Sequence, residues 1–318
     1  MLNFRKTEQT HTAYSTCAME SRDHSNGVSP KNHRSRGNEG IRNYELGITR
    51  KFLLFFVAAM LLSVANASAQ DCDYSGTTGQ LQWCLKNGTL TISGEGVMPD
   101  YGIDLPPDVH PELLHRFKMT MSDNSPWYEY RESIHTVVLE NGVTSIGNNA
   151  FYSCVNLTSI TIPNSVKKIE LSTCLNCLGL TTINVESENN TYASEDGVLF
   201  NKDKSALIRY PAGKTTETYV IPNSVKKIEH FAFLGCKSLT SITIPINTKE
   251  FGSFALFCEN LTSITNLNPK PVKIKNLCVF SSSDRVIQST CVLKVPKNSV
   301  SAYKKADIWK EFNIVGLE

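Results

Sequence analysis

The sequence lacks the motifs that would mark it as an enzyme. It contains no Gly-x-Ser-x-Gly nucleophile elbow, no glycine-rich phosphate loop and no residues in the order of a catalytic triad. His110 and His115 do not have the HExxH spacing and no third ligand stands near them, so we expect a solvated loop there. These absences predict a protein that is not an enzyme and that uses neither a metal nor another cofactor.

Long hydrophobic runs are also missing, except at one place. The apolar stretch Phe52–Ala65 follows Arg50 and Lys51 and precedes the small residues Ala67–Ala69. A basic flank, a short apolar run and an A-x-A site are typical of a secretory signal peptide, which we place at residues 51–69. No second run is long enough to cross a bilayer, so no transmembrane span is expected after removal of the signal.

Residues 1–50, in front of the signal peptide, are polar and show no hydrophobic period. Because signal peptides begin near the N-terminus, we favour a translation start that is set too early; the alternative is a disordered leader removed with the signal. Cys72 follows Gln70 and Asp71 rather than small residues, so lipid anchoring is not expected. The mature chain would start at Gln70 and be exported to the cell surface, the medium or the periplasm.

The mature chain has no large excess of charge of either sign. Of 32 basic and 30 acidic side chains, nine and five fall within residues 1–51, which leaves 23 and 25. No basic stripe is present to neutralise phosphates, so nucleic acid is not an expected partner.

What the sequence does contain is repetition. The segment IPNSVKKIE occurs at Ile162–Glu170 and again at Ile221–Glu229. Equivalent strand openings are spaced 23, 23, 36, 23 and 22 residues apart, at Ile134, Leu157, Leu180, Thr216, Leu239 and Leu261. A period of this length is typical of a solenoid, in which each unit packs on its neighbours.

Each unit opens with the pattern L-x-x-I-x-I. Its β-branched alternation predicts a strand with Ile160 and Ile162 pointing inward, which ends at Pro163 because proline cannot donate to a ladder. An A-F-x-x-C segment such as Ala150–Cys154 follows and is long enough for one or two helical turns. About five apolar side chains per unit cannot offset the entropy of ordering about 23 residues, so a single unit is not expected to fold alone.

L-x-x-L-x-L is the strand pattern of leucine-rich repeats, although proline here replaces the usual Asn or Cys after the strand. The continuation VKKIEHFAFLGC at Val225–Cys236 resembles the BspA-like family of bacterial leucine-rich-repeat surface proteins. Three further segments carry the same resemblance: Ser125–Ile134, the insertion Asp196–Pro211 and the closing segment Val295–Phe312. The resemblance implies an α/β repeat fold, a right-handed leucine-rich-repeat solenoid with a parallel β-ladder and short helical turns.

The mature chain divides into three parts in this interpretation. Residues 70–133 form an N-terminal β cap and loop, with a hairpin that turns at Asn87-Gly88. Residues 134–268 form the repeat coils, interrupted by an inserted hairpin at 196–211 that turns near Asn201–Lys204 and is expected to project from the stack. Residues 269–318 form a C-terminal cap with a helix that begins at Ser299.

The cysteines divide into a ladder and two terminal pairs. The repeat register places Cys154, Cys177, Cys236 and Cys258 three residues before the next strand leucine, so we interpret them as buried packing residues. Cys174 then takes the position of Phe151 and Phe233, and no second CxxC supports a redox or zinc site. Near the chain ends we predict a Cys72–Cys84 disulfide first and Cys278–Cys291 second; four unpaired thiols are the alternative.

Outward strand positions form the candidate binding face. They carry hydroxyls and an amide with almost no charge or aromatic ring, at Ser159, Thr161, Thr182, Asn184, Ser241, Thr243, Ser263 and Thr265. Binding hot spots favour Trp, Tyr and Arg, so the stronger contacts are expected at the edges, at Trp127, Tyr128, Tyr130, Arg209 and Tyr210. Solvated strand residues without a binding role are the alternative for the face.

These features favour an exported, non-enzymatic protein that binds other macromolecules. The family resemblance implies adhesion at the bacterial cell surface, with host or neighbouring-cell proteins as partners. The alternative is a structural or carbohydrate-binding component of the envelope, in which the hydroxyl positions contact glycans.

Overall fold

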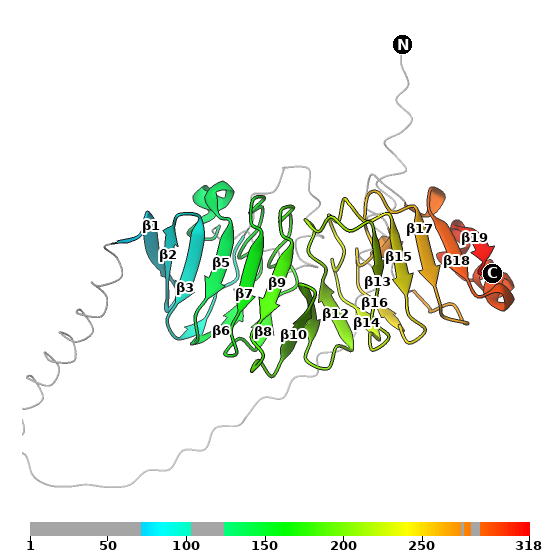
Figure 1. Cartoon of the computed structure of the whole chain (residues 1–318), viewed down its shortest axis with the longest axis horizontal. Coiled ribbons are helices and arrows are strands. Elements are labelled where there is room, and N and C mark those ends of the chain that lie inside the picture. The colour runs from blue at the N-terminus through cyan, green and yellow to red at the C-terminus, as the bar shows by residue number, and fades with distance from the viewer. Residues whose placement is uncertain (1–70, 103–123, 275–276, 281–286) are drawn as a thin grey trace, which may run out of the picture.

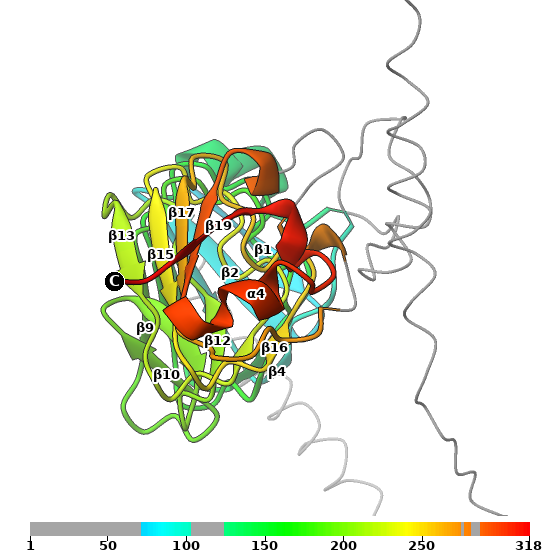
Figure 2. The same cartoon turned by 90° about the vertical axis from the view of Figure 1, so that its right-hand side faces the viewer.

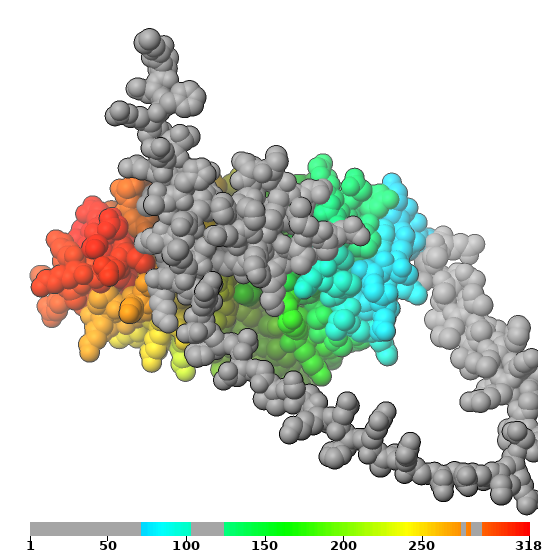
Figure 3. Space-filling model, turned by 180° about the vertical axis from the view of Figure 1, so that it is seen from behind, coloured from blue at the N-terminus to red at the C-terminus, as the bar shows by residue number. Residues whose placement is uncertain are grey.

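The computed structural model describes residues 71–102, 124–274, 277–280 and 287–318. The predicted leader, the signal peptide and the His110–His115 segment lie outside these ranges. Within them the chain is an elongated stack of coils (Figure 1). The stack runs from the N-terminal strands at one end to the C-terminal segment at the other, and Figure 3 shows it from behind.

One side of the stack carries the repeated strands in two sheets. The first has the order β1 (Tyr74–Thr78), β2 (Leu81–Lys86), β3 (Thr89–Ser93), β5 (Thr136–Leu139), β7 (Ser159–Ile162) and β9 (Thr182–Val185). The second has the order β13 (Thr218–Val220), β15 (Ser241–Ile244), β17 (Ser263–Asn266), β18 (Val292–Val295) and β19 (Asn313–Gly316). From β3 to β9 and throughout the second sheet the pairing is parallel. The predicted solenoid of parallel strands is therefore confirmed.

A second side of each coil also forms strands, which the sequence analysis did not anticipate (Figure 2). Here β4 (Gly96–Val97), β6 (Val143–Ile146) and β8 (Lys168–Ile169) make one sheet. The other contains β10 (Tyr192–Glu195), β11 (Val198–Asn201), β12 (Ala206–Arg209), β14 (Lys227–Ile228) and β16 (Glu250–Phe251). Parallel pairing across successive coils gives the stack a second set of backbone hydrogen bonds.

The repeated apolar positions occupy equivalent places in the core. Ile160 and Ile183 are each 2% exposed and Ile242 is fully buried, and backbone pairing aligns Ile160 with Ile183. The cysteine ladder is buried at the same depth in every coil, with Cys154, Cys177, Cys236 and Cys258 at most 2% exposed. Successive coils thus cover each other's apolar corners, as the repeat register predicts.

The A-F-x-x-C corners form turns, so the prediction of helical turns there is wrong. Asn149, Phe231 and Phe254, each directly before the corner, have φ of 56°, 60° and 55°, which lies in the left-handed region and cannot continue an α-helix. The corner N–H groups also bond outside their own coil: Phe151 donates to the Thr173 carbonyl at 2.9 Å. These bonds between coils alternate with single-turn bonds inside the corner, such as that from the Cys154 N–H to the Phe151 carbonyl at 3.2 Å.

The N-terminal end of the stack is a β-meander that begins one strand earlier than expected. The predicted hairpin is β2 and β3, and Asn87 and Gly88 at its turn have φ of 48° and 78°. Strand β1, which the sequence analysis missed, pairs antiparallel with β2. The predicted disulfide joins Cys72 to Cys84 across this pair with an S–S distance of 2.05 Å.

The inserted hairpin does not project from the stack, contrary to the prediction. Its two strands are β11 and β12, and β12 pairs in parallel with β14 of the following coil. Val198 and Phe200 on β11 are fully buried in the C-terminal core cluster, whereas Leu199 between them packs in the N-terminal one. Because successive strand side chains point to opposite faces, β11 forms a wall between two halves of the core.

The C-terminal end contains less helix than predicted. The expected helix is broken into a 3-10 turn at Lys297–Ser299, the short helix α4 (Val300–Tyr303) and a 3-10 turn at Trp309–Glu311. The chain then adds β19 to the first side of the stack, where β19 pairs with β18. Further 3-10 turns lie at Tyr128–Ser133, Leu277–Val279 and Ile287–Ser289. Over the described ranges no helix is both long and apolar enough to span a bilayer.

Replacing Phe200 with alanine tests the wall between the two core halves. The ring is fully buried, so the substitution is expected to lower the free energy of unfolding by about 3–5 kcal/mol, measured by urea denaturation. The control is Lys204→Ala on the same hairpin, which removes an exposed ion pair with Glu195 and is expected to cost less than about 1 kcal/mol. Equal, small effects would mean that β11 does not contribute to the core.

Candidate binding surface

The outward strand side chains form two parallel rows along the stack, and all of the predicted face residues lie in them. Backbone pairing aligns Thr136, Ser159 and Thr182 in the first sheet. In the second sheet it aligns Ser241 with Ser263 and Thr243 with Thr265. The predicted residues are half-buried, except Asn184, which is exposed. We call these two rows the hydroxyl face.

A threonine just before each strand holds the face in place. Thr158 donates its hydroxyl to the His135 carbonyl of the preceding coil at 2.9 Å, and Thr181 donates to Thr158 at 3.1 Å. Thr240 and Thr262 make the same bond at 3.2 Å in the second sheet. These hydroxyls are therefore committed to the scaffold. The side chains of the hydroxyl face lie on the outward side of the strands, although Ser263 Oγ is itself buried.

The face is not continuous, because the insertion interrupts it. On the far edge of β9, the Ile183 N–H donates to the Gly197 carbonyl at 2.9 Å and the Val185 N–H donates to Ser194 Oγ at 3.1 Å. The turn between β10 and β11 thus occupies the edge that the next coil would use. Towards the C-terminus the rows end in Val292, Lys294, Asn313 and Val315 instead of hydroxyls.

Three of the five predicted edge residues are buried, so they cannot serve as contacts. The Trp127 ring is fully buried and its Nε1–H donates to the Ala150 carbonyl at 2.8 Å. Tyr210 is also fully buried and stacks on Phe233 at a centroid distance of 5.2 Å. Arg209 is 7% exposed. Each side chain fills space where the stack is irregular, beside the N-terminal meander or the insertion. No repeat pattern covers these places, so the sequence alone could not distinguish a core position from a surface position there.

The other two edge residues belong to a cluster at the N-terminal end. Tyr130 stacks on Tyr74 with ring centroids 3.9 Å apart, and Tyr74 is 47% exposed. The Arg131 guanidinium lies over the Tyr128 ring, 4.2 Å from its centroid, and donates to the Tyr128 carbonyl at 2.9 Å. We call these four residues the aromatic rim. Tyr74 was missed because its strand was not predicted.

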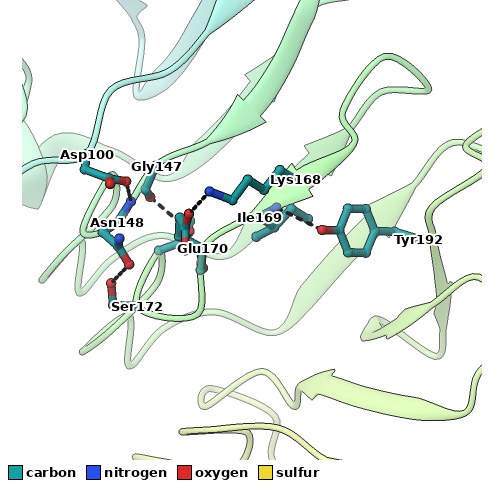
Figure 4. Close-up of polar contacts among 9 residues, drawn as sticks. Asp100, Gly147, Asn148, Lys168, Ile169, Glu170, Ser172 and Tyr192 are labelled. Atoms are coloured by element: carbon teal, nitrogen blue, oxygen red, sulfur yellow. Dashed lines mark hydrogen bonds and ion pairs between the residues drawn. The ribbon is translucent and has the colours of Figure 1, made fainter. Parts of the chain in front are cut away.

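A polar network beside the first coils is structural (Figure 4). Asp100 accepts the Asn148 N–H at 2.7 Å, and the Ser172 hydroxyl donates to Asn148 Oδ1 at 2.6 Å. Further along the coil the Ile169 N–H donates to the Tyr192 hydroxyl at 2.9 Å. Close backbone approach explains Gly147 in this corner, since a Cβ there would lie 1.8 Å from the Pro99 carbonyl oxygen. The network ties the N-terminal segment to the coils.

The repeats, their spacing and this stack of strands agree with one family model. The model, described as a BspA type leucine rich repeat region, matches residues 124–204 and 212–315 in six copies. The chain belongs to the BspA-type leucine-rich repeat family. The resemblance inferred from the sequence is thereby confirmed.

The solved structures to which this chain is similar are distant in sequence. A leucine-rich repeat protein from Eubacterium ventriosum is 22% identical, with 76% of this chain and 83% of that chain covered and a TM-score of 0.35. A leucine rich cell surface protein from Faecalibacterium prausnitzii is 17% identical, with coverage of 79% and 96% and a TM-score of 0.33. The pneumococcal vaccine antigen PcpA is 16% identical, with coverage of 78% and 100% and a TM-score of 0.29. No curated protein matches the sequence.

Cysteine thiols form a ladder through the BspA-type coils. Cys177 donates to the Phe151 carbonyl at 2.9 Å and Cys258 donates to the Phe233 carbonyl at 3.4 Å, each across to the preceding coil. Burial raises the pKa of Cys154 to about 12. These contacts match the packing role predicted for the ladder. The second predicted disulfide is wrong, because Cys278 is disulfide-bonded but Cys291 is a free, buried thiol.

The described residues contain no cluster of three His, Cys, Asp or Glu side chains that could hold a metal ion. The described residues instead form an extended surface, the hydroxyl face, with the aromatic rim at its N-terminal end. Such a surface can contact a macromolecule over a wide area, and the rim supplies the side-chain types that dominate binding energy.

Proposed function

We propose that this BspA-type protein is exported and that it binds macromolecules without catalysis, as an adhesion module at the bacterial cell surface. The hydroxyl face supplies contact area and the aromatic rim supplies the energetically dominant contacts. Partners are host or neighbouring-cell proteins. The observation that carries the proposal is the parallel register, which aligns outward polar residues of successive coils: Ser159 with Thr182, Thr161 with Asn184, Ser241 with Ser263 and Thr243 with Thr265.

The physical argument concerns what such a surface does well. A solenoid presents a long, regular face whose residues are set by the repeat and not by a local pocket. Hydroxyls are small and can donate and accept, so they suit broad, wet contacts better than a single deep site. Tyr and Arg at the rim bury large areas with few rotatable bonds, which is why they are common at hot spots.

The alternative function is a structural or carbohydrate-binding envelope component. The specific observation that favours it is the scarcity of charge on the hydroxyl face, where dense hydroxyls could exchange hydrogen bonds with a glycan. A glycan array probed with the purified protein, beside capture on protease-treated and untreated target cells, separates the two. Loss of capture after protease treatment supports a protein partner, whereas array signals with protease-resistant capture support the glycan alternative.

Substitutions on the rim test its role. The triple variant Tyr74→Ala, Tyr128→Ala, Arg131→Ala is expected to weaken binding to target cells about 30-fold, equal to a loss of about 2 kcal/mol. The control is Lys168→Ala, which changes an exposed residue on β8, on the other side of the coil, and is expected to leave binding unchanged. Circular dichroism confirms that the variants are folded. Unchanged binding by the folded triple variant would remove the rim from the proposal.

Location is tested independently of binding. Intact cells are treated with protease, and the released peptides and the N-terminus of the mature protein are identified by mass spectrometry. The proposal predicts release of peptides from the coils and a mature N-terminus at Gln70. A protein that resists the protease in intact cells but is degraded in lysed cells would contradict surface exposure, and an intact N-terminus at Met1 would contradict signal cleavage.

A further inference from the structure

Cys174 departs from the pattern of the other coils. It stands where the register places Phe151 and Phe233, both fully buried, and it is itself half-buried with a free thiol. Cys177, three residues later in the same turn, is 2% exposed and also free. A small thiol in place of an aromatic ring leaves room, and the insertion places Arg209 there.

Arg209 is a buried cation whose hydrogen bonds go to backbone carbonyls. Its guanidinium donates to the Phe231 carbonyl and, at 2.7 Å, to the Leu171 carbonyl, so it bridges the coils on both sides of the insertion. Among the ion pairs of the described residues, none includes Arg209. Burial lowers the pKa of the Arg209 guanidinium, and negative charge on Cys174 raises it again in part. A buried cation is stabilised by a nearby anion, and the thiolate of Cys174 is placed to be that anion.

An open cavity reaches this pair from outside. It has a volume of about 340 Å³, and Cys174, Cys177 and Arg209 are among the residues that line it. Lys237 and Glu259 at its wall are both exposed, so the wall carries one charged side chain of each sign. The volume lies in the range of sites that hold small organic molecules.

The two thiols differ in the way that thiol–disulfide exchange requires. The neighbouring Cys177 thiol and the charge of Arg209 lower the pKa of Cys174, although burial opposes the shift. Burial and the neighbouring Cys174 raise the pKa of Cys177, whose S–H donates to the Phe151 carbonyl at 2.9 Å. The half-buried Cys174 is therefore the nucleophile, because the thiolate is the attacking form, and the buried Cys177 remains a thiol until it is needed.

We propose that Cys174 and Cys177 form a thiol–disulfide exchange site for small-molecule disulfides that carry both ammonium and carboxylate groups and enter this cavity. The Cys174 thiolate attacks one sulfur of the disulfide R–S–S–R, which forms a mixed disulfide and releases RS⁻. Cys177 then attacks the Cys174 sulfur, closes the Cys174–Cys177 disulfide and expels the second RS⁻. The Cys174 and Cys177 protons end on the two RSH products, so two protein thiols are oxidised and one small-molecule disulfide is reduced. An exported chain would meet such disulfides outside the cytosol.

Trapping the mixed disulfide tests the proposal. The reduced full chain is incubated with oxidised glutathione and mapped by peptide mass spectrometry. The wild type is expected to form the Cys174–Cys177 disulfide, and Cys177→Ser is expected to retain glutathione on Cys174. The control Cys236→Ser changes the register equivalent of Cys177 and should behave as the wild type. If folded Cys177→Ser carries no glutathione on Cys174, or carries it equally on Cys154 and Cys258, the proposal is wrong.

The pH dependence of alkylation tests Arg209 as a positioning residue. At neutral pH, Cys174 is expected to react with iodoacetamide at least about ten-fold faster than Cys154 and Cys258, since a larger fraction of it is thiolate. Its rate should rise through a midpoint below that of an ordinary thiol, because the pKa is lowered. Arg209→Met should move that midpoint upward and Arg209→Lys should restore it. Uniformly slow alkylation of all buried cysteines in the folded wild type would overturn the assignment. These measurements use purified protein, so their failure would leave the surface-binding proposal untouched.

Discussion

The structure depends on one constraint: no coil can bury its own apolar corners, so each must be covered by the next. Ile160 and Ile242 are at most 2% exposed because a neighbouring coil lies on each side of them. Ile183 is equally buried, with a coil on one side and the insertion on the other. Backbone groups follow the same rule. Strand N–H groups donate to the adjacent coil, and at the corners Phe151 and Phe233 do so as well, at 2.9 and 3.1 Å. The outward positions inherit this spacing, and therefore the polar face is a consequence of how the core is built.

The insertion shows what happens when the constraint is interrupted. Thirty-six residues separate two strand openings instead of about 23. The chain responds by turning β11 into a wall with Leu199 on one side and Phe200 on the other, so that both halves of the core remain covered. The regular pattern is lost around it: the strand face is divided, Arg209 bridges two coils, and a cavity opens beside Cys174.

The register of the repeats was predictable from sequence because burial imposes it directly. Leucine, isoleucine and cysteine positions recur at a fixed period, so their inward placement, the β2–β3 hairpin and the outward rows followed from the pattern. The turns at the corners were not predictable, since the left-handed conformation of Phe231 and Phe254 and the bonds to the next coil depend on neighbouring backbone. Neither was the burial of Trp127, Arg209 and Tyr210, which lie where no repeat continues. Tyr74 joined the site only once β1 was seen to pair with β2, and Arg131 once its guanidinium was seen to lie over the Tyr128 ring.

Amide hydrogen exchange across the stack tests the central claim most directly. The backbone hydrogen bonds between neighbouring coils should protect the amides of all the repeated strands to a similar extent. Peptides that cover β7, β9, β15 and β17 should exchange slowly and to a similar extent, and those from the exposed turns between them should exchange faster. Rapid exchange in any one of these four strands, with the others protected, would contradict a stack in which every coil is held by its neighbours.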